Sequence, residues 1–150
     1  MYQVRWEKRL AAAVVGAVPH RLIQALQGMV VGRPFLRAVN YHETPIEGRD
    51  QFRRHLDFYR EHYCDVSFDD LRQFLHDGTW NKPRPGLIIS FDDGYRDNAT
   101  VAAPLLEEFG FTGWFFVPSC FAAEGDDGAG GNRPPRPTMT VEQLRALAGR

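Results

Sequence analysis

The chain has 150 residues, of which 43% are hydrophobic and 13% aromatic, enough apolar material for the core of one ordinary domain. Its 18 basic and 19 acidic residues are spread along the whole length and give a net charge of -1, which argues against a nucleic acid or an anionic membrane as partner. The two cysteines, Cys64 and Cys120, lack the CxxC spacing of a zinc ribbon, and we expect free, partly buried thiols.

The first 34 residues predict a helical segment separate from the rest. Arg5, Lys8 and Arg9 precede an apolar run over residues 10–18, which has the outline of a signal peptide but no good small-residue cleavage site after it. The run is shorter than the roughly twenty apolar residues of a membrane-spanning helix. We expect a peripheral helix over residues 1–34, and the sequence leaves a secreted, a cell-envelope and a cytoplasmic location open.

From residue 35 onward, strand and helix patterns alternate. Residues 35–41 predict a strand. Phe52, Leu56 and Tyr59 recur at helical spacing and predict a helix over residues 51–61 whose other face is charged.

A short extended stretch over residues 63–66 leads into the next helix. Ser67 stands three residues before Asp70, the spacing of a capping box, so a helix is predicted to begin after Ser67. Gly78 is predicted to end it.

The middle of the chain predicts a buried strand followed by an interrupted helix. Residues 87–91 are nearly all apolar, which suits a strand buried on both faces. Apolar residues at helical spacing, among them Val101, Leu105 and Phe109, predict a helix over residues 97–109 that stops at Gly110. Pro104 lacks a backbone N–H, so we expect either a kink there or a regular helix that begins near Pro104.

The last third predicts a strand, a long loop and a helix. The strand covers residues 114–117, the Gly-, Asp- and Pro-rich loop covers 122–137, and the helix runs from its cap Thr140 to Gly149. About four strand–helix units in a row predict a parallel α/β architecture with right-handed crossovers. Spacing alone is compatible with both an open sheet and a segment of a barrel.

Two consecutive acidic residues, Asp92 and Asp93, follow the buried strand at the place where α/β folds present reactive groups. Two carboxylates about 4 Å apart would repel by roughly 4 kcal/mol at an effective dielectric near 20, which favours a bound cation or a shared proton. Gly94 permits the sharp turn that would bring both carboxylates to one site. The alternative is that Asp92, Asp93 and Asp97 cap the following helix and face water.

Residues 87–98, with the sequence LIISFDDGYRDN, resemble the first motif of the polysaccharide deacetylases, the carbohydrate esterase family that contains the chitooligosaccharide deacetylases. Residues 39–42 resemble the opening strand of that family and residues 114–118 its next strand. The resemblance covers about residues 35–148. It implies an incomplete (β/α) barrel of the glycoside hydrolase and deacetylase type, with residues 35–150 forming the N-terminal half of the domain.

The resemblance implies that Asp92 is a general base and that Asp93 is a ligand of a divalent, zinc-type metal. Family members complete that metal site with two histidines from a later His-(Ser/Thr)-x-x-His segment, and this chain has no histidine after Asp93. It therefore supplies no histidine ligand, and we expect it to retain the metal poorly. His42, which follows the opening strand, and Tyr95 are candidates to line the site.

The function implied is metal-dependent hydrolysis of N-acetyl groups on the amino sugars of an N-acetylated polysaccharide or oligosaccharide. Because the histidine segment is missing before the end at Arg150, we expect the chain to be truncated and inactive alone. The alternative is a non-catalytic or incomplete module that binds glycan or another chain. In either case, uncovered barrel edges predict self-association. Phosphoryl transfer is disfavoured, because Gly94 occupies the position of the second aspartate of the dehalogenase pattern and no lysine follows Lys82.

Overall fold

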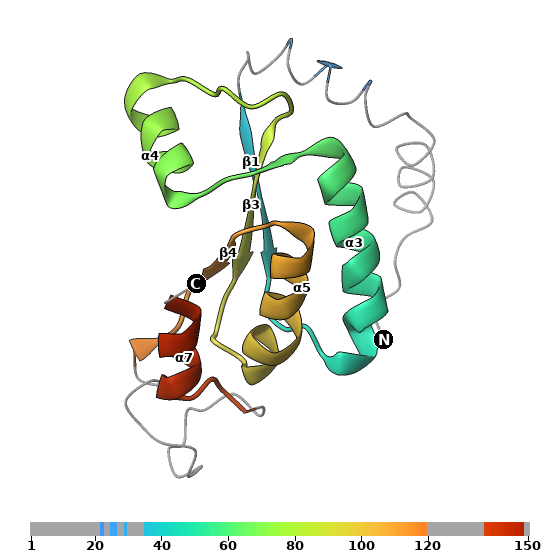
Figure 1. Ribbon diagram of the computed structural model, residues 1–150, viewed down its shortest axis with the longest axis vertical. Helices are drawn as coiled ribbons and strands as arrows, with labels where there is room; N and C mark the ends of the chain where they lie inside the picture. The colour runs from blue at the N-terminus through green and yellow to red at the C-terminus, as the bar shows by residue number, and fades with distance from the viewer. Residues whose placement is uncertain (1–21, 23–24, 27–28, 30–34, 120–136, 149–150) are drawn as a thin grey trace, which may run out of the picture. The chain divides into compact units, whose positions relative to one another are not determined.

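A computed structural model describes residues 22, 25–26, 29, 35–119 and 137–148 (Figure 1). The chain divides into two compact units, Met1–Phe35 and Leu36–Arg150. The helical segment predicted over residues 1–34 lies largely outside the described residues, as do Cys120 and nearly all of the predicted loop. Cys64 is described and is a free, partly buried thiol, as expected. Within the described ranges, no helix is both long and apolar enough to cross a membrane.

Strands and helices alternate along the second unit (Figure 1). In chain order they are β1 (Leu36–Tyr41), the 3-10 turn η1 (Ile46–Gly48), α3 (Arg49–His62), β2 (Cys64–Asp65), α4 (Phe68–Asp77), β3 (Gly86–Phe91), the π-helical turn η2 (Asn98–Ala102), α5 (Ala103–Phe109), β4 (Gly113–Phe115) and α7 (Val141–Ala148). All strand pairs in this sheet are parallel. The predicted α/β class built from parallel strand–helix units is therefore confirmed.

The third strand, β3, is the centre of the sheet. Its whole length pairs with β1, from Leu36 opposite Gly86 to Tyr41 opposite Phe91. Its other edge is shared, because β2 pairs with the first two residues of β3 and β4 pairs with the last three. The strands β1, β3 and β4 therefore bring their carboxyl ends to one edge of the sheet.

The hydrophobic core lies between β3 and the helices α3 and α5. Leu87, Ile89 and Phe91 alternate along β3 and are at most 1% exposed. They pack against Phe52 and Leu56 of α3 and against apolar residues of α5. The two helices lie side by side in Figure 1, and a two-pronged ion pair between Arg53 and Glu108 joins them at their solvent-facing side.

The opposite side of the sheet, called here the open face, carries the alternate residues of the same strands. Ala38 and Asn40 of β1 are exposed, and their register partners on β3, Ile88 and Ser90, are half-buried. Because successive side chains of a strand point to opposite faces, these residues cannot contribute to the core beneath α3 and α5.

Local signals in the sequence set most of the helix ends. Ser67 and Asp70 form the predicted capping box, with Asp70 N donating to Ser67 Oγ at 3.2 Å and Ser67 N donating to Asp70 Oδ2 at 2.8 Å. Gly78 ends α4 in the left-handed conformation, with φ 66°. Near Pro104, the regular helix α5 begins at Ala103 after a π-helical turn, because proline is tolerated in a first turn where its missing N–H has no partner.

The prediction for the last strand was wrong at its end by two residues. The strand was expected over residues 114–117, but β4 ends at Phe115. Phe116 still donates its backbone N–H to Phe91 O at 2.8 Å. Pairing then stops, because β3 itself ends at Phe91 and the chain turns away at the acidic pair.

Candidate functional site

The acidic pair occupies a tight turn at the carboxyl end of β3. Asp93 has a φ of 66° and Gly94 a φ of 63°, so two consecutive residues adopt the left-handed conformation. That conformation costs an ordinary L-residue about 1–2 kcal/mol, and aspartate tolerates it better than most. The sequence placed the conformational freedom at Gly94, whereas the structure shows that the turn already begins at Asp93.

Gly94 is required by space as well as by conformation. A Cβ atom on Gly94 would lie 2.7 Å from Cγ1 of Val117 and 3.2 Å from its Cγ2, closer than real Cβ contacts allow. Val117 follows β4, so the turn after β3 packs directly against the segment that follows the neighbouring strand. This close approach fixes the position of the acidic pair relative to the sheet.

Asp92 is held by the strand β1. Its backbone N donates to Tyr41 O at 2.9 Å, which extends the ladder by one residue. Its side chain accepts a hydrogen bond at Oδ2 from Asn40 Nδ2 at 2.8 Å. Asn40 is itself oriented, because Ser90 Oγ lies 3.0 Å from Asn40 Oδ1. The carboxylate of Asp92 is thereby directed to the open face, on which Asn40 and Ser90 lie.

His42 follows β1 and lies next to Asp92 in the register of the sheet. Its carbonyl oxygen accepts a hydrogen bond from Asn98 Nδ2 at 3.1 Å, and Asn98 is fully buried. The side chain of His42 is exposed. The structure thus fixes the backbone of His42 beside the acidic turn, and no contact between its imidazole and either carboxylate occurs within the described residues.

Tyr95 connects the acidic turn to the segment that precedes α7. Tyr95 forms an isolated antiparallel bridge with Thr138. On either side of that bridge, Arg96 N donates to Pro137 O at 2.9 Å and Met139 N donates to Gly94 O at 2.8 Å. Residues 137–139 therefore lie directly against the turn that carries Asp92 and Asp93.

The histidines on the helices are engaged elsewhere. Tyr41 OH lies 3.0 Å from Nδ1 of His55 and 2.8 Å from the hydroxyl of Tyr59. Burial raises the pKa of Tyr41, and its hydrogen bond with Tyr59 raises it further, so this phenol stays protonated. His62 ends α3 and His76 lies on α4. His55 is thus hydrogen-bonded to Tyr41 at the edge of the core.

A complete metal site is not formed by the residues that the structure describes. Within them, no group of three or more His, Cys, Asp or Glu side chains is arranged to hold a metal ion. A zinc site needs three protein ligands for catalysis and four for a structural role. Asp93 with Asp92 offers fewer than this number, so the described residues do not by themselves fit the zinc-type ion that the resemblance implies.

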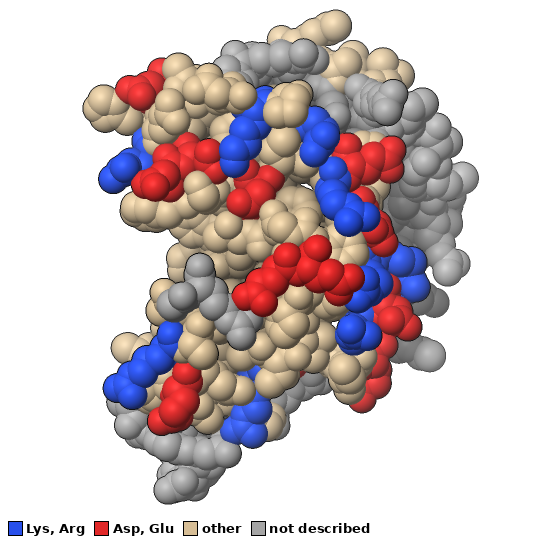
Figure 2. Space-filling model, in the orientation of Figure 1, with Lys and Arg blue, Asp and Glu red and all other residues tan. Residues whose placement is uncertain are grey.

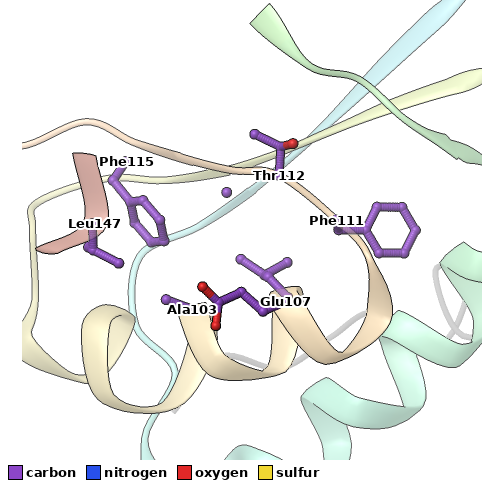
Figure 3. Close-up of a pocket in the computed structure, with 8 residues that line it drawn as sticks. Ala103, Glu107, Phe111, Thr112, Phe115 and Leu147 are labelled. Atoms are coloured by element: carbon purple, nitrogen blue, oxygen red, sulfur yellow. The ribbon is translucent and has the colours of Figure 1, made fainter. Parts of the chain in front are cut away.

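A pocket lies on the other side of the sheet, between α5, β4 and α7 (Figure 3). It has a volume of about 240 Å³. Glu107 is the one titratable residue of its lining, which is otherwise Ala103, Leu106, Phe111, Thr112, Gly113, Phe115 and Leu147. In Figure 3, Phe115 and Leu147 are drawn at one end of this lining and Phe111 at the other. Because it holds neither Asp92 nor Asp93, we place the candidate chemistry at the acidic turn and not in this pocket.

The charged residues do not form a broad field of one sign on the face shown in Figure 2. Lysine and arginine side chains lie among aspartate and glutamate side chains there. The charges are therefore interspersed on this face, as they are along the sequence.

Sequence reasoning missed two groups that shape the site. Asn40 lies within the strand motif that supports the resemblance, yet it received no role, because its contact with Asp92 joins residues 52 positions apart. Phe116 falls within the predicted strand over residues 114–117 and received no role, yet 57% of its surface is exposed. Register was the missing information, since alternation along β4 would have placed Phe116 on the face opposite Phe115.

The comparisons with known proteins give a fold. No family model matches the chain, and no curated protein matches its sequence. Among solved structures, the Streptococcus pyogenes deacetylase PplD in complex with acetate matches with a TM-score of 0.61 and 17% identity over 76% of this chain and 52% of that one. A de-N-acetylase from Aggregatibacter actinomycetemcomitans matches with a TM-score of 0.58 and 18% identity, over 77% of this chain and 48% of that chain. The BpsB deacetylase domain from Bordetella bronchiseptica matches with a TM-score of 0.57 and 20% identity, over 76% of this chain and 50% of that chain.

The chain spans about half the length of these solved deacetylases. At this level of identity the likeness is one of fold. The predicted fold, an incomplete barrel of parallel strand–helix units of the deacetylase type, is therefore confirmed.

Proposed function

We propose that residues 35–150 are the N-terminal half of a polysaccharide deacetylase domain, preceded by a separate helical segment over residues 1–34. The complete site would hydrolyse N-acetyl groups on the amino sugars of a polysaccharide. The observation that carries this proposal is the acidic turn at the carboxyl end of β3, in a fold shared with deacetylases. In parallel α/β folds, this edge of the sheet is where ligands bind.

In this proposal Asp92 is the general base. Amide hydrolysis needs a group that takes a proton from the attacking water, while the amide nitrogen leaves as an amine. Oδ2 of Asp92 accepts a hydrogen bond from Asn40, and no described residue donates a hydrogen bond to Oδ1. In this proposal, Oδ1 is the oxygen that accepts the proton. His42 and Tyr95 border the turn, and we propose them as residues that line the site.

Asp93 is proposed as a ligand of a zinc-type metal, and the other ligands would come from outside the described residues. A single carboxylate holds such an ion weakly, because zinc sites combine several imidazole, thiolate or carboxylate ligands. We therefore propose that the 150-residue chain retains little metal and has no deacetylase activity alone.

Turnover and metal retention test this proposal together. The purified chain and its Asp92→Asn and Asp93→Asn variants are incubated with an N-acetylglucosamine tetramer, with and without added Zn²⁺, and released acetate is measured. We expect no release in any sample, and no zinc in the chain after dialysis. Zinc-dependent release that disappears in Asp92→Asn would contradict the proposed inactivity while supporting the role of Asp92. The coding DNA after the codon of Arg150 provides an independent test, since a reading frame that encodes a His-(Ser/Thr)-x-x-His segment is expected there.

A second candidate function is a non-catalytic module that binds glycan or another chain. The lack of a three-ligand metal group within the described residues favours it. Two measurements separate the functions: the module binds the N-acetylglucosamine tetramer as well after Asp93→Asn as before, and it gains no activity when the histidine segment is supplied. Restored turnover would exclude the module.

A further inference from the structure

Phe116 and Asp92 are neighbours across the sheet. The register pairs Phe91 of β3 with Phe115 of β4, and Phe116 N donates to Phe91 O at 2.8 Å. The ladder ends at this pair, and the residues that directly follow it on the two chains are Asp92 and Phe116. Neighbouring strands are about 4.8 Å apart, so the two residues stand side by side at the carboxyl edge of the sheet.

Both side chains point to the open face. The ring of Phe115 stacks on the ring of Phe91 at a centroid distance of 5.1 Å and joins the core on the helix side. Because side chains alternate along a strand, Phe116 projects to the opposite side. Asp92 lies on that same side, since its carboxylate accepts a hydrogen bond from Asn40 at 2.8 Å.

The ring of Phe116 is placed where it makes little contact with the protein. Of its surface, 57% is exposed, whereas Phe115, one residue earlier, is partly covered and Phe91 is fully buried. Exposing an aromatic ring to water has a free-energy cost of about 1.5–3 kcal/mol relative to burying it. A ring left open beside a carboxylate is therefore suited to a ligand that has both an apolar face and polar groups.

A pyranose ring has this character. The axial C–H groups of a gluco-configured sugar form a flat apolar face, and hydroxyl and acetamido groups surround it. An aromatic ring covers the apolar face, while the open oxygen of Asp92 accepts a hydrogen bond from the polar rim. The polar residues Asn40 and Ser90 lie on the same face as Trp114, the register partner of Ser90, so this face offers both apolar and polar groups to a ligand.

We propose that Phe116 is a stacking platform that holds an N-acetylated amino-sugar unit beside Asp92. The proposal rests on the proposed function for the class of substrate, and it adds the residue that binds the sugar ring. Stacking on Phe116 selects a pyranose with a flat C–H face, and the acetamido group of that sugar, next to the platform, then reaches the acidic turn.

Binding of short glycans to the full 150-residue chain tests the platform. The N-acetylglucosamine tetramer is titrated by nuclear magnetic resonance into the wild-type chain and into Phe116→Ala, Phe116→Trp and Phe58→Ala. We expect Phe116→Ala to weaken Kd by about five- to tenfold and Phe116→Trp to retain or tighten it, because the stacking surface is lost in one and enlarged in the other. Phe58, which is 41% exposed on α3, is the matched control and its removal is expected to leave Kd unchanged.

Titration with the fully deacetylated glucosamine tetramer separates this inference from the proposed function. Equal Kd values for wild type and Phe116→Ala, with the fold shown intact by circular dichroism, would overturn the platform and leave the proposed function standing. Loss of binding in Phe116→Ala without preference for the acetylated tetramer would keep the platform and count against the deacetylase assignment. A wild-type chain that binds neither tetramer would overturn the platform as well.

Discussion

Two glycines with nearly the same backbone conformation have different roles in this chain. Gly78, with φ 66°, ends α4, and a Cβ atom there would meet nothing within 4 Å. Gly94, with φ 63°, turns the chain after the acidic pair, and a Cβ atom there would meet Val117 at 2.7 Å. A comparison of Gly78 with Gly94 therefore separates the cost of the left-handed conformation from the cost of a steric clash with Val117.

Alanine at the two positions is predicted to destabilise the fold unequally. Gly78→Ala is expected to lower the free energy of unfolding by about 1 kcal/mol, the cost of a left-handed L-residue. Gly94→Ala is expected to lose a further 1–3 kcal/mol or so, because the new methyl group overpacks against Val117. Urea unfolding followed by circular dichroism measures both values. Equal losses would show that Val117 moves aside freely.

The residue-scale features of the site were only partly predictable. Asp92 and Asp93 could be singled out, because an acidic pair followed by glycine after an apolar run is a local pattern. The left-handed conformation of Asp93 could not, since a glycine next to it offered a cheaper place for the turn. The bond from Asn40 to Asp92 depends on strand register across 52 residues, which no local pattern contains.

At the scale of the elements, the start of α4 links helix capping to a charged network. Asp70 accepts hydrogen bonds from Ser67 N at 2.8 Å and from Lys82 Nζ at 2.6 Å. Burial opposes ionisation of Asp70, but the hydrogen bonds from Lys82 and Ser67 outweigh it and hold the pKa of Asp70 below its ordinary value of 3.8. The capping box therefore also ties α4 to the segment that leads into β3.

Removing this carboxylate is predicted to change how stability depends on pH. A depressed pKa stabilises the folded state above pH 3.8, and that contribution is lost as the pH falls through the lower pKa of the folded state. Asp70→Asn should therefore be less stable than wild type at neutral pH, and the difference should shrink below pH 3.8. Thermal unfolding across this pH range measures it. The control is Asp69→Asn, whose side chain is 81% exposed and should show no comparable trend.

The helices and strands themselves were largely predictable, because their signals are local. The capping box at Ser67, the stop at Gly110 and the start of regular helix near Pro104 each follow from the chemistry of one or two residues. The end of β4 was misplaced, because a strand ends where its partner ends and the apolar run continues through Val117. The sequence likewise did not predict that β2 and β4 share one edge of β3, because this pairing joins segments that are distant in the chain.

At the scale of the whole molecule, the sheet has an unpaired edge and an open face. In the described residues, β1 pairs with β3 alone. Backbone groups of alternate residues point to opposite edges of a strand. Tyr41 O and Val39 O point to β3, as their hydrogen bonds show, so the backbone groups of Ala38 and Asn40 point to the free edge. Such an edge is a template for pairing with another chain.

The chain is therefore predicted to self-associate, and proline at the free edge is predicted to reduce this. Ala38→Pro removes an outward N–H and leaves the ladder with β3 intact. Size-exclusion chromatography with light scattering should show a larger share of monomer than for wild type at equal concentration. Val39→Pro is the control, because it removes a group that faces β3 and should unfold the chain. A wild-type chain that stays monomeric up to high concentration would contradict the prediction.

The pairing of β1 with β3 also has a consequence for the timing of synthesis. Leu36 pairs with Gly86, 50 residues later in the chain. At roughly 5–20 residues per second, β1 waits about 3–10 s on the ribosome before the strand that completes it is made. During that interval Val39 and Tyr41, later packed against the core, have no sheet to join. The nascent chain thus carries an unpaired strand with apolar residues during this interval, a state that is prone to aggregate.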